Sequence, residues 1–445
     1  MRFVPLAVAG LAALSLAACT AGKEGGPALG SQPKPSDTAP SALPATTIEL
    51  WHGFSADSEV KAFTDAIAGF NKKYPQITVK LVKGVQDEQI TQAVRGGRPP
   101  DVASSFTTDS VAAWCKSGVF QDLTPVIKQD GVDLSVMPAV VNDYTQYEGK
   151  RCVMPLLTDA YGLYYNKALM KGHQPPKTLS ELTKLAKELT VRDPDGTIKV
   201  AGFIPSAQYY ENTPGHWAPM VGAKWTNPDG TSAIGSDPAW KKLLTWQKEL
   251  IDWYGHANLE KFRKSLGDEF SANHPFYKNK IAMAIDGEWR VAMLANEAPK
   301  IDYGTAPMPV DDAKPDLYGG GFTAGTVIGV PKGAKHPEAA WALVKYLSTD
   351  TDALVTLANA IRNVPTTTAA LQSPQLKKDE HFQTFLDIFA NPKTITIPAH
   401  VNSTFNQEAL QSFIASWEKG SAKDLDAGLA GVDKTINDKL KLSGG

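Results

Sequence analysis

Asp286 and Glu288 stand two residues apart, next to Trp289, and their side chains could do acid–base chemistry. Glycosidases use two carboxyl groups to protonate the leaving oxygen and to attack the sugar or activate water. The preceding residues, 281–285 (IAMAI), predict a buried strand, and residues two apart at its end need not frame a scissile bond. An exported glycan-active enzyme stays open as one alternative for this chain.

Other catalytic and cofactor signatures are missing from the sequence or incomplete. There is no P-loop, G-x-S-x-G or H-E-x-x-H motif, and the eight histidines lack zinc-site spacing. Gly319, Gly321 and Ala324 satisfy G-x-G-x-x-A, but a β run follows where a dinucleotide site requires a helix. DPDG (193–196) and NPDG (227–230) lack the remaining ligands of a calcium loop and predict turns. We expect no metal and no cofactor.

The N-terminus has the pattern of a secretory signal. Arg2 is followed by an uncharged apolar run, residues 3–18, which falls short of the roughly 20 residues of a membrane-spanning helix. The end of this run, Leu16 to Cys19 (LAAC), resembles the lipobox of bacterial lipoproteins. We therefore expect residues 1–18 to be removed and Cys19 to carry lipid; the alternative is cleavage at an Ala-x-Ala-like site and release. Residues 19–46 are rich in small and polar residues and predict a flexible tether.

Cysteine usage indicates the redox compartment, and the net charge restricts the classes of binding partner. If Cys19 carries lipid, Cys115 and Cys152 remain as an even pair in an oxidising compartment, and we expect them to form a disulfide. The alternative is two separate buried thiols. The formal net charge is −2 with interspersed signs, which argues against nucleic acid or an anionic surface as a partner. Contact with the membrane is expected through the lipid anchor only.

From Thr47 onward, about 400 residues predict two domains or lobes. Short β runs alternate with amphipathic helices, which favours a parallel sheet covered by helices. The expected strands are 47–51, 77–82, 101–106, 163–165, 281–285 and 326–330. The expected helices are 60–70, 88–95, 178–189, 240–254, 337–347 and 425–436, the last capped by Ser421.

Nine segments in a fixed order carry a family resemblance. They are LWHGFS (50–55), FNKKYPQITV (70–79), RPPDV (98–102), YEGKRCVMPLLTDAYGLYYNKALM (147–170), PPKTLSEL (175–182), KIAMAIDGEW (280–289), DYGTAPMPV (302–310), GGGFTAGTVIGVPKGAKHPEAAWALVKYL (319–347) and AIRNVPTTT (360–368). In these segments the chain resembles the extracellular solute-binding proteins of carbohydrate ABC importers, the group that includes maltose-binding protein.

The resemblance implies an α/β, two-lobed periplasmic-binding-protein fold (type II, Venus-flytrap) with an inter-lobe hinge and a ligand cleft. It places residues 47–157 plus 309–362 in an N-terminal lobe and residues 158–308 plus 363–445 in a C-terminal lobe. The crossings are expected near Leu157–Ala160, near Met308–Val310 and after Arg362. The implied protein is a non-enzymatic, monomeric receptor on the outer face of the cytoplasmic membrane, which delivers a small carbohydrate to the transmembrane subunits of a permease.

Four residues match family ligand positions most directly. Trp289 matches an aromatic that packs on a sugar ring, and Phe322 a second stacking position, with Gly321 allowing close backbone approach. Asp159 matches a carboxylate that accepts sugar hydroxyls at the first crossing. Arg362 could donate a planar fork of hydrogen bonds. The alternatives are core packing for the two aromatic rings and ion pairs for the two charged groups.

Five further residues are candidates for the cleft: His52, Asp109, Tyr161, Trp217 and Glu288. The abundance of aromatic candidates favours a sugar or oligosaccharide as the ligand. The alternative ligand is glycerol 3-phosphate or a related polyol phosphate, because relatives with a similar LWH start bind such compounds. That ligand requires a cationic site, to which Arg362 and His52 could contribute.

Overall fold

The computed structural model describes residues 43–55, 57–402 and 404–442. The expected signal peptide, the lipidated Cys19 and nearly all of the expected tether lie outside the described residues. Within the part that is described, no helix has both the length and the apolar character needed to cross a bilayer.

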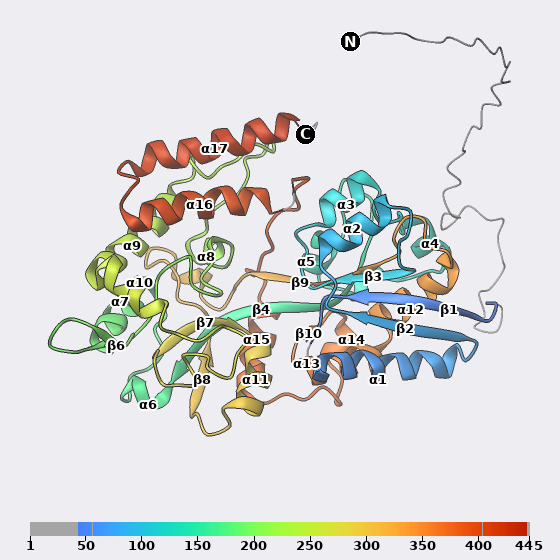
Figure 1. The fold of residues 1–445 in the computed structure, drawn as a ribbon, viewed down its shortest axis with the longest axis horizontal. Coiled ribbons are helices and arrows are strands. Elements are labelled where there is room, and N and C mark those ends of the chain that lie inside the picture. Colours follow the sequence, from blue (N-terminus) through green and yellow to red (C-terminus); the bar gives the residue numbers. More distant parts are fainter. Residues whose placement is uncertain (1–42, 56, 403, 443–445) are drawn as a thin grey trace, which may run out of the picture.

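The molecule has two lobes, which confirms the expected fold class (Figure 1). The N-terminal lobe is built on six strands in the order β10-β4-β9-β3-β1-β2. In Figure 1, α1 and α13 lie on one side of this sheet and α2 and α3 on the other. Its elements are β1 (Thr46–His52), α1 (Asp57–Lys73), β2 (Ile77–Lys83), α2 (Asp87–Arg95), β3 (Val102–Ser105), α3 (Val111–Ser117), α4 (Thr124–Gln129), η2 (Leu134–Val136), α5 (Ala139–Tyr144), β4 (Met154–Asn166), β9 (Thr323–Gly329), α12 (Pro337–Thr349), α13 (Thr351–Ile361), β10 (Val364–Pro365) and α14 (Thr368–Leu371).

The C-terminal lobe is mainly helical around the far half of β4. Strands β7 and β8 pair with that half, and α16 packs against α17 (Figure 1). Its elements are α6 (Lys167–Met170), α7 (Leu179–Glu188), β5 (Val191–Arg192), β6 (Ile198–Val200), α8 (Pro214–Val221), α9 (Pro238–Tyr254), α10 (His256–Arg263), β7 (Met283–Gly287), α11 (Trp289–Glu297), β8 (Tyr303–Ala306), η3 (Pro315–Leu317), α15 (Glu380–Ala390), α16 (Phe405–Lys419) and α17 (Leu425–Leu442).

Strand β4 joins the lobes. Its first half pairs with β9 and β10, and its second half pairs with β7 and β8. The change of partners falls at Asp159 to Tyr161, where Asp159 faces Ala324 and Tyr161 faces Gly287. The first expected crossing, near Leu157–Ala160, therefore lies within one continuous strand.

The second crossing differs from the expectation. Val310 pairs with Thr178, and its N–H bonds to Lys177, so the segment 308–310 lies among elements of the C-terminal lobe. The return to the N-terminal sheet runs along β9, which pairs with both β4 and β3. The third passage follows β10 and leads through α14 to α15, which packs on β4 and β8.

The expected parallel sheet is wrong for most of the strand pairs. Strands β1, β2 and β3 run parallel, as the strand-helix-strand order predicts, but β9 is antiparallel to β3 and β4, and β10, β7 and β8 are antiparallel to β4. A strand that returns from the other lobe enters the sheet from the opposite end, so its direction depends on the long-range crossing and not on local alternation.

The turns and the helix start expected from short sequence motifs agree better with the structure than the expected strand directions do. DPDG is the turn of the β5–β6 hairpin, and NPDG forms a turn closed by Gly230 and Asn227. The capping box predicted at Thr178 starts α7, where Thr178 accepts from the N–H of Glu181. Ser421 does not cap the last helix, because α17 begins only at Leu425. Asp424 takes that role and accepts from the N–H of Ala427 at 2.9 Å.

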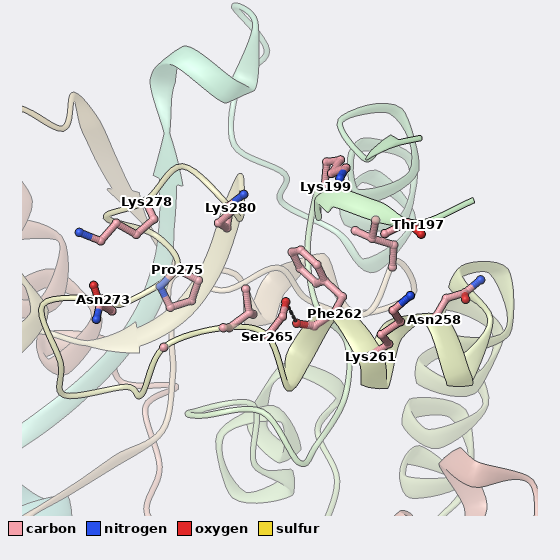
Figure 2. A pocket seen from close by; sticks show the side chains of 13 residues that line it. Thr197, Lys199, Asn258, Lys261, Phe262, Ser265, Asn273, Pro275, Lys278 and Lys280 are labelled. Atoms are coloured by element: carbon pink, nitrogen blue, oxygen red, sulfur yellow. Dashed lines mark hydrogen bonds between the residues drawn. The ribbon is translucent and has the colours of Figure 1, made fainter. Parts of the chain in front are cut away.

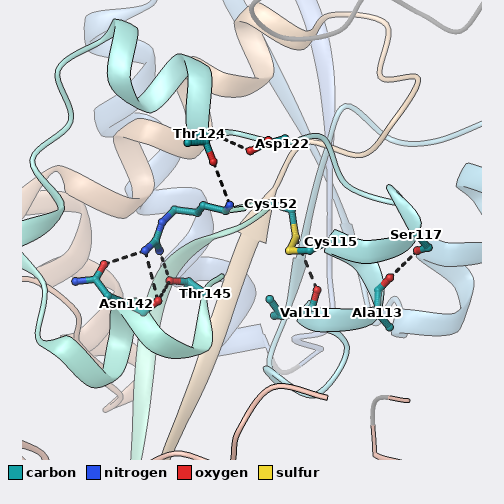
Figure 3. The surroundings of a disulfide bond; sticks show 10 residues. Val111, Ala113, Cys115, Ser117, Asp122, Thr124, Asn142, Thr145 and Cys152 are labelled. Carbon is teal, nitrogen blue, oxygen red and sulfur yellow. Dashed lines mark hydrogen bonds between the residues drawn. A yellow bond between two sulfur atoms is a disulfide. The ribbon is translucent and has the colours of Figure 1, made fainter. Parts of the chain in front are cut away.

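Cys115 on α3 and Cys152 before β4 form the expected disulfide, with Cα atoms 5.4 Å apart (Figure 3). The bond closes a separation of 37 residues within the N-terminal lobe. Nearby, the buried Arg151 side chain bonds to Asn142 and Thr145 on and beside α5 (Figure 3). The disulfide therefore ties α3 to the segment that leads into the strand shared by both lobes.

Reduction of this disulfide is expected to lower the free energy of unfolding by about 4 kcal/mol at most, the chain-entropy value for a loop of this length. Urea denaturation with and without dithiothreitol measures the difference. The double variant C115S/C152S is the control and should not respond to the reductant. Equal stability of the oxidised and reduced wild type would contradict a stabilising role.

Candidate functional site

A cleft of about 630 Å³ lies between the lobes and contains most of the expected ligand residues. On the N-terminal side it is lined by residues that follow the ends of β1 and β3, as ligand sites in such sheets are. These are Gly53, Phe54, Ser55, Phe106, Thr107 and Asp109. From the hinge strands and the C-terminal lobe come, among others, Asp159, Tyr161, Glu211, His216, Phe270, Trp289, Phe322 and Gln407, with Asn363 following α13.

Tyr161 is the centre of an aromatic cluster in the cleft. His216 stacks on its ring with 3.7 Å between ring centroids, and Phe322 lies 5.6 Å away. The ring of Trp289 meets Tyr161 edge-on at 5.5 Å. Because burial lowers the pKa of His216 to about 4, its imidazole is neutral near pH 7. The cluster therefore presents uncharged rings to a ligand.

The indole of Trp289 is held over the end of β7. A Cβ on Gly287 would collide with the indole ring, so only glycine lets the ring lie across the backbone there. Trp289 is partly exposed in the cleft, and its buried Nε1 has no hydrogen-bond partner among the described residues. A ligand oxygen at that position would satisfy this donor.

Two exposed aromatic rings were missed by the sequence analysis. Phe106 is 47% exposed and Phe270 is 63% exposed, and both line the cleft from opposite lobes. We expected Phe106 inside a strand, but β3 ends at Ser105 and leaves the ring in the loop. The one sequence feature linked to Phe106 is the glycine at position 53. A Cβ at Gly53 would collide with the Phe106 ring.

Asp159 lines the cleft, whereas Glu288 lies behind it with no exposed surface. The Glu288 carboxyl accepts hydrogen bonds from the N–H of Ala160 at 2.8 Å and from Asn363 Nδ2 at 2.7 Å. Asn363 Nδ2 also donates to Asp159. Asn363, the residue after the expected Arg362, is thus the polar side chain that the third passage brings to the cleft.

Asp109 joins the two lobes across the cleft. Its carboxyl accepts a hydrogen bond from Gln407 Nε2 on α16 at 3.1 Å. Burial raises the pKa of Asp109, and the bonds to Thr107 and Gln407 act in the opposite direction. Asp109 was a predicted site residue, whereas Gln407, 298 residues further on, was not identifiable from local sequence.

Two of the expected ligand residues point elsewhere. Arg362 adopts a left-handed conformation at the end of α13, pairs with Asp379 at 3.0 Å and bonds to the carbonyl of Lys377. It does not line the cleft. Trp217 is buried on α8, where its Nε1 donates to Asn212 and its ring packs against Trp246. Its neighbour His216 faces the cleft instead.

His52 and Gly321 also serve packing. The His52 ring is fully buried and stacks on Phe63, with 4.8 Å between centroids, and burial lowers its pKa to about 4. A Cβ at Gly321 would meet the Ile388 side chain. The backbone N–H of Gly321 donates to the Thr394 hydroxyl at 3.1 Å. Neither residue is among those lining the cleft.

The cleft offers carboxyl groups but no cation. None of the described residues that line it is a lysine or an arginine, while Glu59, Asp109, Asp159 and Glu211 do line it. The predicted carboxyl pair is not presented there either: Asp286 is buried and pairs with Arg290 at 2.6 Å, and it does not line the cleft. The site can accept and donate hydrogen bonds without a compensating positive charge.

A second hollow, of about 570 Å³, has the opposite character (Figure 2). It lies beside β6 and α10, and Lys199, Lys261, Lys278 and Lys280 surround it. All four lysines are exposed, and Lys199 pairs with Asp193. Because exposed ammonium groups keep their water, they attract an anion only weakly. The cleft, whose polar groups are partly buried, is therefore the stronger candidate for a ligand-binding site.

The chain belongs to the family of bacterial extracellular solute-binding proteins, whose family model matches residues 65–384. Two relatives match most of the length of this chain. The maltodextrin-binding protein MdxE of Bacillus subtilis is 25% identical over 400 residues, which is 86% of this chain and 90% of that protein. The maltotriose-binding protein of Pyrococcus abyssi is 22% identical over 344 residues, 75% of this chain and 69% of that protein.

A solved structure of CpMnBP1 with mannotriose bound has the same fold. The TM-score is 0.77 at 24% identity, and the match covers 87% of this chain and 99% of that chain. The two lobes are therefore arranged here as in known solute-binding proteins.

The substitution Gly287→Ala is expected to displace the indole of Trp289 and to destabilise the protein by about 1–3 kcal/mol, the usual cost of overpacking. Near-ultraviolet circular dichroism and urea denaturation measure the two effects. Gly431→Ala on α17 is the matched control, because a Cβ there meets nothing within 4 Å and should stabilise the helix. An unchanged tryptophan spectrum in Gly287→Ala would contradict the proposed clash.

Proposed function

We propose that this protein is the lipid-anchored substrate-binding component of an ABC importer and that it captures a sugar or oligosaccharide between its lobes. One observation carries the proposal: the cleft combines exposed and partly exposed aromatic rings with hydrogen-bonding side chains and, among the described lining residues, no cation. Aromatic faces pack on the C–H faces of pyranose rings, and carboxyl and amide groups bond to the hydroxyls. The carbohydrate names of the relatives support this ligand class.

A polyol phosphate fits the cleft less well. A phosphate group requires positive charge or several N–H donors, and the residues expected to supply charge, Arg362 and His52, lie outside the cleft. The carboxyl groups of Asp109 and Asp159 would repel such a ligand. Four lysines surround the hollow beside α10 instead.

An exported glycan-active enzyme is also disfavoured. Catalysis by a carboxyl pair requires both groups to flank the bond that breaks, but Asp286 is held in an ion pair and Glu288 lies behind Asp159. We propose that the ligand leaves the protein unchanged.

The proposed cycle places a monomer on the outer face of the cytoplasmic membrane, attached through lipid on Cys19. Ligand bound between the rings of both lobes would favour a closed form, which the transmembrane subunits of the permease would recognise. Strand β4 is the hinge for this motion, because it pairs with β9 and β10 in one lobe and with β7 and β8 in the other.

The function is tested by titrating the protein with maltotriose, mannotriose, simple monosaccharides and glycerol 3-phosphate. Tryptophan fluorescence and calorimetry report binding, and chromatography of the recovered ligand reports turnover. We expect saturable binding of at least one oligosaccharide, no binding of glycerol 3-phosphate and no product. Preferential binding of the phosphate, or consumption of the sugar, would overturn the proposal.

The substitution Trp289→Ala is expected to weaken oligosaccharide binding by about 10- to 100-fold, because a ring face and a buried donor are lost. Calorimetry on the variant measures this change. The control is Trp253→Ala, since Trp253 is 39% exposed on α9 and does not line the cleft. Equal loss of affinity in both variants would show that the effect is not specific to the cleft.

A further inference from the structure

Asp159, Glu288 and Asn363 form a buried cluster at the floor of the cleft. Asp159 lies on β4, Glu288 lies between β7 and α11, and Asn363 follows α13, so three separate parts of the chain meet here. The two hydrogens of one amide nitrogen serve two acceptors, and Asn363 Nδ2 donates to both carboxyl groups. Asp159 is 7% exposed and Glu288 is 0% exposed.

Among the described residues, neither carboxyl forms an ion pair. Two ionised carboxylates held this close in a buried site repel each other, so one of them retains a proton. Burial raises the pKa of Asp159 to about 7, while its bonds to Glu288 and Asn363 act to lower it. Burial and the neighbouring charge of Asp159 raise the pKa of Glu288 well above its usual value.

We propose that Asp159 and Glu288 share a single proton and that Glu288, acting through Asp159 and Asn363, is a positioning residue that makes ligand capture depend on pH. This inference rests on the proposed function, since it assumes that Asp159 receives a ligand hydroxyl. Above neutral pH the proton resides on Glu288 and Asp159 is ionised. Asp159 then offers a charge-assisted acceptor to the ligand.

The sign of the pH effect follows from this arrangement. A ligand that binds ionised Asp159 more tightly lowers the pKa of Asp159 in the complex, so binding releases protons in the range where Asp159 is partly protonated. Affinity should therefore fall as the pH falls through about 7. We expect about a tenfold loss between pH 8 and pH 5.5, the difference between a charge-assisted and a neutral hydrogen bond.

Other titratable groups surround the pair. They are Tyr144, Tyr161, Tyr164, Asp109, Glu211 with its neighbour Glu269, and Asp286 with Arg290. Burial raises the pKa of each of these tyrosines, which leaves them neutral, and Arg290 compensates Asp286. Burial raises the pKa of Glu269 to about 7 and raises that of Glu211 well above its usual value, so these two glutamates are the competing source of a pH effect.

The test compares the wild type with Glu288→Gln between pH 5.5 and pH 8.5, using maltotriose and mannotriose as calorimetric probes. Glutamine can still accept from the N–H of Ala160 and has no titratable proton, but its Nε2 replaces the oxygen that accepts from Asn363. Because the bond between Glu288 and Asp159 acts to lower the pKa of Asp159, its loss should move the midpoint of the affinity loss to higher pH. A purely structural role would instead lower affinity equally at every pH.

Two control variants isolate the cluster. Glu269→Gln removes the competing carboxyl, and Glu418→Gln removes a buried carboxyl outside the cleft whose pKa burial also raises to about 7. Neither should move the midpoint. A wild-type affinity that does not depend on pH, or a midpoint that moves with Glu269→Gln and not with Glu288→Gln, would overturn the inference.

A second measurement is independent of any sugar. Carboxyl carbon-13 NMR of the ligand-free protein should show a resonance that titrates near pH 7, that is absent in Asp159→Asn and that titrates at higher pH in Glu288→Gln. If Asp159 titrates at its ordinary value near 4, the proton-sharing pair is overturned. If the pair is present but neither trisaccharide binds at any pH, the proposed ligand class fails, and with it the link between the proton and ligand capture.

Discussion

The continuous hydrogen bonding of β4 is the constraint on which the rest of the structure depends. One strand of 13 residues pairs with β9 and β10 in one lobe and with β7 and β8 in the other. Strand pairing continues from Met154 to Asn166, with one irregularity between Pro155 and Leu157, so the lobes cannot separate at this point without breaking a buried ladder. The change of partners at Asp159 to Tyr161 therefore fixes where the lobes meet and where the cleft opens.

The same change of partners explains why the floor of the cleft is polar. A carboxyl group on β4 needs a hydrogen-bond partner when it is buried. Asn363 reaches Asp159 from the third passage, and Glu288 bonds to Asn363 from the end of β7 in the C-terminal lobe. Above this floor the aromatic cluster around Tyr161 excludes water and strengthens each polar contact. The hinge and the binding site are consequently built from the same few residues.

Glycines placed beside aromatic rings shape the walls of the cleft. Gly53 makes room for Phe106, and Gly287 makes room for Trp289. In each case the backbone passes directly under a ring, which holds a broad apolar face at a defined position. The two rings come from different lobes, so a ligand held between them would bridge the hinge. The hydrogen bond between Asp109 and Gln407 already joins the lobes at another point of the cleft.

Local sequence indicated six of the helices and the turns at DPDG and NPDG, because these depend on neighbouring residues, and the even count of two cysteines favoured their disulfide. The resemblance added the two-lobed fold and placed Trp289, Phe322, Asp159, Asp109 and Tyr161 in the cleft. Only the tertiary structure decided that β9, and not residues 308–310, returns to the first sheet, and that Asn363 and His216 face the cleft while Arg362 and Trp217 face away. Adjacent residues on a helix, or at its end, direct their side chains to different sides. Packing between elements far apart in the chain decides which of these side chains faces the cleft.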